Sequence, residues 1–161
     1  MRYANWEELQ ECDYFLNLTS EIAHQATCLR DKCWSIVVKN KEIIWSGFNS
    51  PPANQEDQRR CNCDKSIYHP KVKDQTCCIH AEQRAIMDTL KTHPDKINWS
   101  RLYFVRLDKN WDIEAAGKPY CTICSKMTLD SWISEFVLLH KEWICIYTTG
   151  EYNKLSFEYN E

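Results

Sequence analysis

The apolar positions along the chain recur with two periods, which predict helices alternating with strands. From Trp6 to Arg30 they return mostly every three or four residues, which predicts an amphipathic helix or a short turn followed by a helix. The β-rich runs Trp34 to Val38 and Ile43 to Phe48 predict two strands. Lys39 to Glu42 lies between these strands and is a plausible hairpin connection.

The second half of the chain continues this alternation. In chain order we expect a helix in Cys78 to Thr92, a strand in Leu102 to Val105, a short helix in Cys121 to Ile133, and strands in Phe136 to Leu139 and Trp143 to Tyr147. Such an order predicts an α/β layered fold. The length of 161 residues suits a single domain that covers residues 1–161.

Two segments lack periodic structure. Asn49 to Thr76 holds three prolines and many polar residues, and loops of this length inside compact domains are usually functional or braced. Asp108 to Pro119 is polar and rich in turn residues. After Thr148 the tail has mixed polarity and few clear signals.

Composition and charge narrow the function. The chain is 43% hydrophobic and 27% charged, which excludes a disordered protein, and its net charge of −3 gives no basic field to attract a nucleic acid. Met1 to Leu18 carries several charges and cannot serve as a signal peptide, and no apolar run reaches the roughly 18 residues of a membrane span. We therefore expect a cytoplasmic protein, in which ten cysteines suggest metal binding or catalysis before disulfides.

Two motifs, each at the start of a predicted helix, indicate the chemistry. They are His80-Ala81-Glu82 and Pro119-Tyr120-Cys121-Thr-Ile-Cys124. Cysteines three apart share one helical face, and a helix N-terminus favours thiolate over thiol. One histidine and two cysteines leave the fourth position of a tetrahedral zinc site open for water, which is typical of a catalytic site. Glu82 is then the candidate proton shuttle between that water and a substrate.

This combination matches the signature of zinc-dependent deaminases, in which hydroxide attacks C4 of a cytosine ring and ammonia leaves. A C-x-x-C alone is as often a structural zinc knuckle or a redox pair, and a lone histidine is usually a helix cap. A non-catalytic zinc-stabilised module is therefore the alternative from another class. Glu82 discriminates, because a purely structural site has no use for a carboxylate beside an open coordination position.

From about Trp6 to Tyr147 the chain resembles the deoxycytidylate (dCMP) deaminase branch of the cytidine deaminase superfamily. The motifs that carry the resemblance are Tyr14-Phe15-Leu16, Thr27-Cys28-Leu29-Arg30, Gly47-Phe48-Asn49 with Pro52 nearby, His80-Ala-Glu-Gln-Arg-Ala-Ile86, and Cys121-Thr-Ile-Cys124-Ser-Lys126. The His-Ala-Glu and Cys-x-x-Cys elements are specific to the superfamily, and Gly-Phe-Asn points to its nucleotide branch.

The resemblance implies a three-layer α/β/α sandwich with a mixed five-stranded sheet. It places one catalytic zinc on His80, Cys121 and Cys124, and it makes Glu82 the proton shuttle. It also implies that Asn49 contacts the substrate sugar, that the Ala81 backbone holds the pyrimidine, that dCMP is converted to dUMP, and that the working form is a homo-oligomer, often a hexamer.

Three departures from the family pattern concern the pocket and its regulation. Tyr120 separates Pro119 from the first cysteine and could line the pocket. Arg106 to Pro119 is a longer connection than usual, and Ser50 to Ala53 replaces a glycine-bearing loop, so regulation by a nucleoside triphosphate is not assumed. For the substrate phosphate the candidates are Arg30, Arg59, Arg60 and Lys126, whose alternative interpretation is solvated surface charge.

A second group of cysteines suggests a structural zinc. Some relatives tie the long loop to the first helix with such an ion, and Cys28 with Cys61 or Cys63, His69 and Cys77 could supply four ligands; Cys78 lies beside them in the sequence. An ion would offset the ordering entropy of so long a loop. The alternative is that these thiols are free or packed. Cys12, Cys33 and Cys145 look like small core residues.

Other substrates remain open within the enzyme class. Deamination of a base in tRNA or single-stranded DNA is disfavoured by the negative charge and by the lack of a basic-aromatic tract. Cytidine, dCTP or guanine as a free substrate is harder to separate from dCMP.

Seven tryptophans stand against only three glycines. The resemblance leads us to expect glycine at Trp34 and Trp132, whereas Trp6 fits the family. Trp45, Trp99, Trp111 and Trp143 occupy turn or strand-entry positions where glycine is natural. This pattern suggests the hypothesis that UGA codons read as glycine in the source organism are written here as tryptophan.

Overall fold

The computed structural model describes residues 1–72 and 76–160, so residues 73–75 of the predicted long loop lie outside the described residues. The helices are α1 (Trp6–Ile22), α2 (Ala81–Thr92), α3 (Thr122–Asp130) and α4 (Thr149–Phe157). The strands are β1 (Arg2–Tyr3), β2 (Lys32–Lys39), β3 (Glu42–Phe48), β4 (Arg101–Leu107), β5 (Ile113–Glu114), β6 (Glu135–Leu139) and β7 (Ile144–Thr148). None of the described helices combines the length and the apolar character that a membrane crossing requires.

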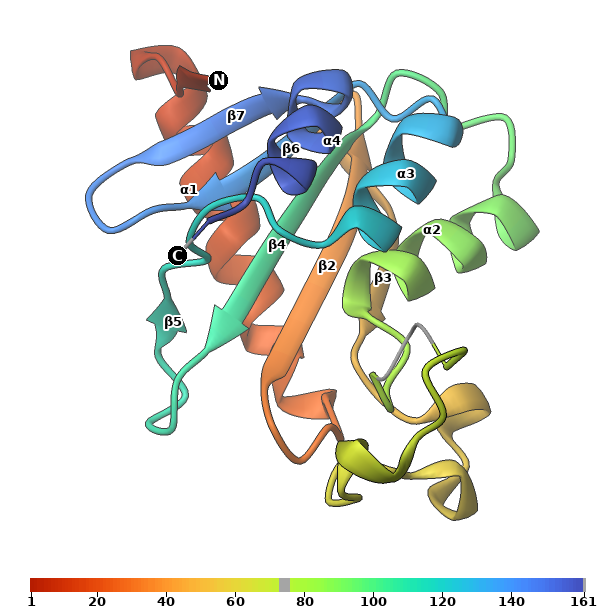
Figure 1. Ribbon diagram of the computed structural model, residues 1–161. Coiled ribbons are helices and arrows are strands. Elements are labelled where there is room, and N and C mark those ends of the chain that lie inside the picture. The colour runs from red at the N-terminus through yellow and green to blue at the C-terminus, as the bar shows by residue number, and fades with distance from the viewer. Residues whose placement is uncertain (73–75, 161) are drawn as a thin grey trace.

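The strands form one mixed sheet in the order β1-β7-β6-β4-β2-β3, and β5 pairs with the end of β4 (Figure 1). β4 and β6 are parallel, whereas β2 is antiparallel to both β3 and β4. The predicted mixed sheet is confirmed, but its predicted count of five strands is corrected to seven. The two additional strands, β1 and β5, have two residues each, which is too short to produce a recognisable apolar alternation.

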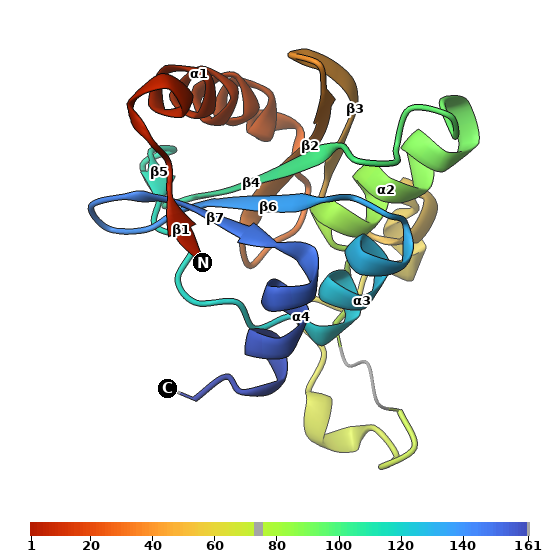
Figure 2. The same cartoon turned by 90° about the horizontal axis from the view of Figure 1, so that it is seen from above.

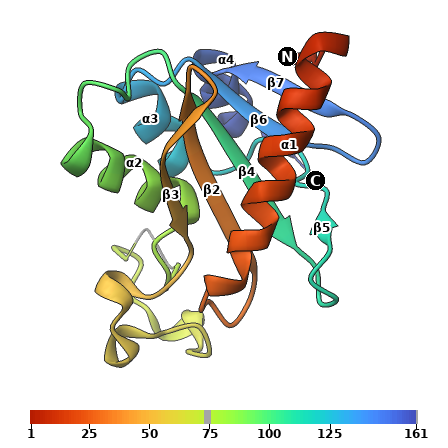
Figure 3. The same cartoon turned by 180° about the vertical axis from the view of Figure 1, so that it is seen from behind.

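Helices cover both faces of the sheet, which confirms the three-layer α/β/α architecture. α1 lies on one face and α2, α3 and α4 lie on the other (Figures 2 and 3). Side chains alternate along β2, so that Ile36 packs with Phe15 of α1 whereas Val37 packs with Ile86 of α2. The long predicted loop contains three short 3-10 helices, Pro52–Asn54, Glu56–Gln58 and Lys65–Ile67.

Polar contacts fix the start of α1. The Glu8 backbone N–H donates to Asn5 Oδ1 at 2.9 Å, and the Glu8 carboxylate accepts from the Asn5 N–H at 3.3 Å, which completes a capping box. The same carboxylate accepts hydrogen bonds from Arg2 at 2.5 and 2.8 Å and from Arg101 of β4 at 3.1 Å. The hydrogen bond from Arg2 is the main reason that the pKa of Glu8 falls from 4.5 to about 2.

This lowered pKa predicts a pH-dependent contribution to stability. A carboxyl whose pKa is lower in the folded state than in the unfolded chain stabilises the fold above the unfolded value, and loses that contribution as the pH falls toward the folded value. We expect Glu8→Gln to lower the free energy of unfolding by about 1 kcal/mol at pH 7, which is typical of a partly exposed network of charged groups. The penalty should shrink as the pH falls from 4.5 toward 2. Urea unfolding of both proteins across this range measures it, and a pH-independent penalty would contradict the assignment.

Gly47 of β3 lets α2 approach the sheet closely. A Cβ at this position would lie 2.5 Å from the Ala81 carbonyl oxygen and closer still to the Ala85 nitrogen, and both are backbone atoms. Glycine is therefore required for steric reasons, and the contact sets where the first turn of α2 lies above β3.

We expect Gly47→Ala to destabilise the fold by about 1–3 kcal/mol through overpacking, because a backbone cannot move aside as a flexible side chain can. Thermal unfolding measures the loss. Gly150→Ala is the matched control, because a Cβ there meets no atom within 4 Å. Equal stability of the Gly47 and Gly150 variants would show that α2 is free to move.

Candidate active site

The residues of the two sequence motifs meet where α2 and α3 begin. His80 Nδ1 lies 3.2 Å from Cys124 Sγ and 3.4 Å from Cys121 Sγ, and the three ligand atoms lie within 4.8 Å of one another. Cys121 and Cys124 are buried and His80 is half-buried. The structure thus brings together the three residues that the sequence analysis selected as zinc ligands.

Helix starts position these three side chains. His80 is the N-cap of α2, and its backbone N–H donates to Gln83 Oε1 at 2.9 Å. Cys121 is the N-cap of α3, where its sulfur accepts the Cys124 N–H at 3.4 Å. A hydrogen bond from the Cys124 thiol is the first cause that lowers the pKa of Cys121 to about 4. One imidazole nitrogen and two sulfurs fit Zn²⁺ and leave room for a fourth ligand.

Glu82 is a buried carboxyl beside this triad. Its exposed fraction is 6%, although it belongs to the first turn of α2 and lines a cavity together with His80. Burial raises the pKa of Glu82. A buried carboxyl with a raised pKa on a cavity wall, beside side chains that could hold a metal ion, is typical of a functional site.

The three residues predicted to contact substrate, Asn49, Ala81 and Tyr120, all line this cavity. Asn49 Oδ1 accepts the Cys33 N–H at 3.0 Å, and its Nδ2 donates to the Asp31 carbonyl at 2.8 Å. Asn49 therefore holds the backbone of residues 31–33 in place, where the start of β2 lines the cavity. Its contact with a sugar stays a prediction.

Two cationic side chains line the same cavity, Arg30 and Lys65. Arg30 is exposed and Lys65, which begins the 3-10 helix Lys65–Ile67, is half-buried. Arg30 was predicted from the sequence and Lys65 was not, because an irregular loop has no period that shows which of its side chains turn inward.

The other candidate phosphate ligands have different surroundings. Arg59 is paired with Glu56 at 2.6 Å, and Arg60 donates to the Asp57 carbonyl at 2.8 Å. Lys126 lies in a separate groove on α3. Of the four cations named from the sequence, Arg30 alone is among the residues that line the cavity within the described part of the chain.

Comparison with known proteins identifies the family. The family model for the cytidine and deoxycytidylate deaminase zinc-binding region matches residues 9–140. The chain belongs to this deaminase family. The sequence is 27% identical over 101 residues to the deoxycytidylate deaminase of Schizosaccharomyces pombe, which covers 52% of this chain and 31% of that protein. It is 30% identical over 93 residues to the deoxycytidylate deaminase of Mycobacterium phage D29, which covers 54% of this chain and 69% of the relative.

Solved structures support the deaminase fold. The dCMP deaminase from cyanophage S-TIM5, in complex with dCMP and dUMP, aligns with a TM-score of 0.55 and 22% identity over 77% of this chain and 76% of that one. The cytidine deaminase from Burkholderia pseudomallei aligns with a TM-score of 0.54 and 15% identity over 86% and 94% of the two chains. The chain spans about a third of the fission yeast relative.

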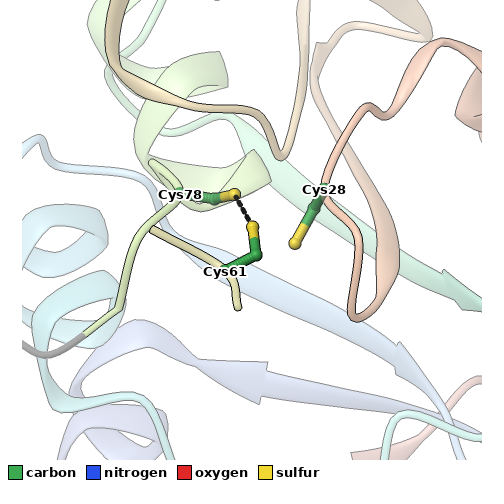
Figure 4. Close-up of side chains that lie close together, drawn as sticks. All are labelled: Cys28, Cys61 and Cys78. Atoms are coloured by element: carbon green, nitrogen blue, oxygen red, sulfur yellow. Dashed lines mark hydrogen bonds between the residues drawn. The ribbon is translucent and has the colours of Figure 1, made fainter. Parts of the chain in front are cut away.

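A second group of cysteines lines the same cavity. Cys28, Cys61 and Cys78 are buried, and their sulfurs lie within 4.8 Å of one another (Figure 4). Cys61 Sγ lies 3.6 Å from Cys78 Sγ and 3.4 Å from Cys77 Sγ. Cys28, Cys61, Cys77 and Cys78 also line the cavity that holds Glu82.

The second group differs in membership from the predicted ligand set. The structure joins Cys28 and Cys61 with Cys78, whereas the half-buried Cys63 and the exposed His69 lie outside the triad formed by the described residues. Cys77 and Cys78 are neighbours in sequence; Cys78 is buried and Cys77 is half-buried. A pair of adjacent cysteines does not reveal from sequence alone which thiol turns inward.

The surroundings of Cys61 favour its thiolate. Burial acts to raise the pKa, but hydrogen bonds from the Leu29 N–H, Cys77 and Arg59 outweigh it and lower the pKa to about 6. Three buried sulfurs, of which that of Cys61 is stabilised as a thiolate, fit a divalent ion such as Zn²⁺ that binds sulfur ligands. Among the remaining cysteines, Cys12 and Cys145 are buried in the core as expected, whereas Cys33 is half-buried and lines the cavity.

Proposed function

We propose that this chain catalyses the zinc-dependent hydrolytic deamination of a cytosine nucleotide, converting dCMP and water to dUMP and ammonia. The observation that carries the proposal is the buried Glu82 carboxyl on the wall of a cavity that also contains His80. A closed structural site needs four protein ligands and no carboxyl, whereas this triad supplies three.

The residues of the site divide the chemistry between them. His80, Cys121 and Cys124 would hold the zinc, which when bound supplies hydroxide at neutral pH by lowering the pKa of water. Glu82 accepts the proton of the attacking water and delivers it to the ring nitrogen N3. It then takes the remaining proton from the new C4 hydroxyl and passes it to the amine, so that the C4–N bond breaks, the C4 carbonyl forms and ammonia leaves. Backbone groups of Ala81 and the ring of Tyr120 would orient the pyrimidine.

A nucleoside monophosphate is proposed because two cations border the cavity. Arg30 and Lys65 line it, and charge-assisted hydrogen bonds to a phosphate are among the strongest that side chains make. Two relatives are named deoxycytidylate deaminase, and one similar structure contains dCMP and dUMP.

We expect Arg30→Ala combined with Lys65→Ala to raise KM for dCMP about tenfold or more, because a lost ionic hydrogen bond costs about 1.5–3 kcal/mol. The KM for deoxycytidine, which has no phosphate, should not change. Lys126→Ala is the matched control, since Lys126 lies in a separate groove. Steady-state kinetics with both substrates measures the effect. Equal changes in both KM values would assign these cations a structural role.

A panel of dCMP, dCTP, deoxycytidine, CMP and a cytosine-containing single-stranded oligonucleotide tests the substrate class. We expect the highest kcat/KM for dCMP. A higher kcat/KM for the oligonucleotide than for dCMP would indicate a nucleic-acid deaminase instead. A higher kcat/KM for deoxycytidine would show that substrate recognition does not require the phosphate.

We also propose a second, structural zinc on Cys28, Cys61 and Cys78, with Cys77 as the fourth ligand. Cys77 Sγ lies 3.4 Å from Cys61 Sγ and 3.9 Å from Cys78 Sγ. The ion would tie the loop before α2 to the segment between α1 and β2, and so reduce the entropy cost of ordering that loop.

The proposed metal sites also bear on the compartment in which the protein works. Because both sites need thiolates, we propose a compartment that keeps thiols reduced, such as the cytoplasm. A single domain that assembles as a homo-oligomer is proposed as the working unit.

A further inference from the structure

Three tryptophans have a left-handed backbone conformation. The φ angles of Trp99, Trp111 and Trp132 are 62°, 70° and 60°. L-residues avoid this region because Cβ approaches a carbonyl oxygen, and a bulky residue there is an outlier. Tryptophan accounts for seven of the 161 residues. Among residues 1–72 and 76–160, however, it accounts for three of the seven non-glycine residues with positive φ, so the enrichment calls for a local explanation.

Trp132 follows the end of α3. Ser131 is the C-cap, its N–H donates to the Met127 carbonyl at 3.0 Å, and the Trp132 N–H donates to the Leu129 carbonyl at 3.1 Å. A left-handed residue directly after the C-cap satisfies the last carbonyls of a helix, and this position is usually glycine.

Trp111 closes the turn between β4 and β5. Its N–H donates to the Asp108 carbonyl at 3.2 Å, and the Asp108 N–H donates to the Asp112 carbonyl at 2.9 Å. These bonds describe a three-residue hairpin loop, in which a type I turn is followed by a left-handed residue that forms a bulge. Glycine is the residue that this bulge selects.

Trp99 lies in the turn that leads into β4. The Ser100 N–H donates to the Ile97 carbonyl at 3.1 Å, so that Trp99 is the third residue of the turn. Positive φ at the third position of a hydrogen-bonded turn is the feature of a type II turn that requires glycine. The three tryptophans therefore occupy three different turn motifs with the same requirement.

The indole rings do not compensate for this conformation by filling the core. Trp99, Trp111 and Trp132 are 71%, 44% and 64% exposed. Trp34 of β2, in contrast to these exposed residues, is buried. It is 2% exposed, and its Nε1 has no hydrogen-bond partner within the described part of the chain. A buried N–H without a partner is unfavourable.

We propose that the functional protein carries glycine at positions 99, 111 and 132, because the organism that encodes it reads as glycine a codon, UGA, that is written here as tryptophan. The proposal does not extend to Trp34, whose φ is not positive. The backbone motifs carry this inference independently of the proposed deaminase activity. Trp6, the first helical residue of α1, has no positive φ and stays tryptophan. Trp45 and Trp143, expected from sequence to be glycine positions, show no positive φ.

Peptide mass spectrometry of the protein isolated from the organism that encodes it, read together with the gene, tests the proposal. We expect glycine at positions 99, 111 and 132, encoded by UGA, and tryptophan at position 6, encoded by UGG. Tryptophan at all three turn positions, or UGG codons there, would overturn it.

Recombinant variants give a second test. Trp99→Gly, Trp111→Gly and Trp132→Gly should each raise the melting temperature by about 2–4 °C in a chain of this size. Trp6→Gly is the control and should lower it, because glycine is a poor helix former. Turn variants that lower the melting temperature or leave it unchanged would contradict the inference, whatever the deaminase assay shows.

Discussion

Glu82→Gln is expected to lower kcat for cytosine deamination by at least 100-fold, and up to about 10⁴-fold, while zinc stays bound. The amide keeps the size of the side chain but cannot accept a proton from water and pass it to the substrate. The carboxyl is buried at the cavity wall, and His80, Cys121 and Cys124 are unchanged in the variant. Steady-state kinetics and zinc content per chain, measured on the same preparation, check both parts of the expectation.

Asp88→Asn is the matched control for this variant. Asp88 lies on α2, as Glu82 does, and its carboxylate accepts a hydrogen bond from Lys91 at 3.1 Å. The control should keep its activity. If Glu82→Gln kept more than a tenth of the wild-type kcat, the proton shuttle would have to be another group.

Cys61→Ser is expected to remove one of two zinc ions per chain and to lower stability strongly. Structural zinc in small peptides contributes about 10–16 kcal/mol of apparent binding free energy, and part of this is folding free energy. Within a fold that already has a core, the loss should appear as a drop in melting temperature. Cys61 belongs to the second triad, and its sulfur also lies near that of Cys77, the proposed fourth ligand. Metal analysis and thermal unfolding measure the two effects.

Cys63→Ser separates metal binding from a general effect of losing a thiol. Cys63 is half-buried, lies two residues from Cys61, and is outside the triad of the described residues. The Cys63 variant should keep two zinc ions and its melting temperature. One zinc ion per wild-type chain, with no difference between the two variants, would exclude the second site.

Local patterns made the main parts of this structure predictable. Strands such as β2 and β4 consist mostly of apolar residues, and the hairpin connection from Lys39 to Glu42 joins β2 to β3. His80, Glu82 and the two cysteines of α3 were predictable because ligands on helix starts keep short, fixed spacings. These features depend on neighbours in sequence.

Features that depend on distant partners were not predictable. α4 has weak amphipathicity, and it packs through Tyr152, whose ring stacks on Phe136 at 4.1 Å. β1 exists because Arg2 and Tyr3 pair with β7 at the other end of the chain. Cys78 and Lys65 were missed for the same reason, because only the folded loop determines which of its side chains face the cavity.

The most direct test of the proposed deamination is to incubate zinc-loaded protein with dCMP and to measure dUMP and ammonia together. We expect the two products to appear in equal amounts, chelation of zinc to stop their formation, and Glu82→Gln to form neither at a comparable rate. A folded, zinc-loaded protein that releases no ammonia from dCMP or from any other cytosine nucleotide would contradict it.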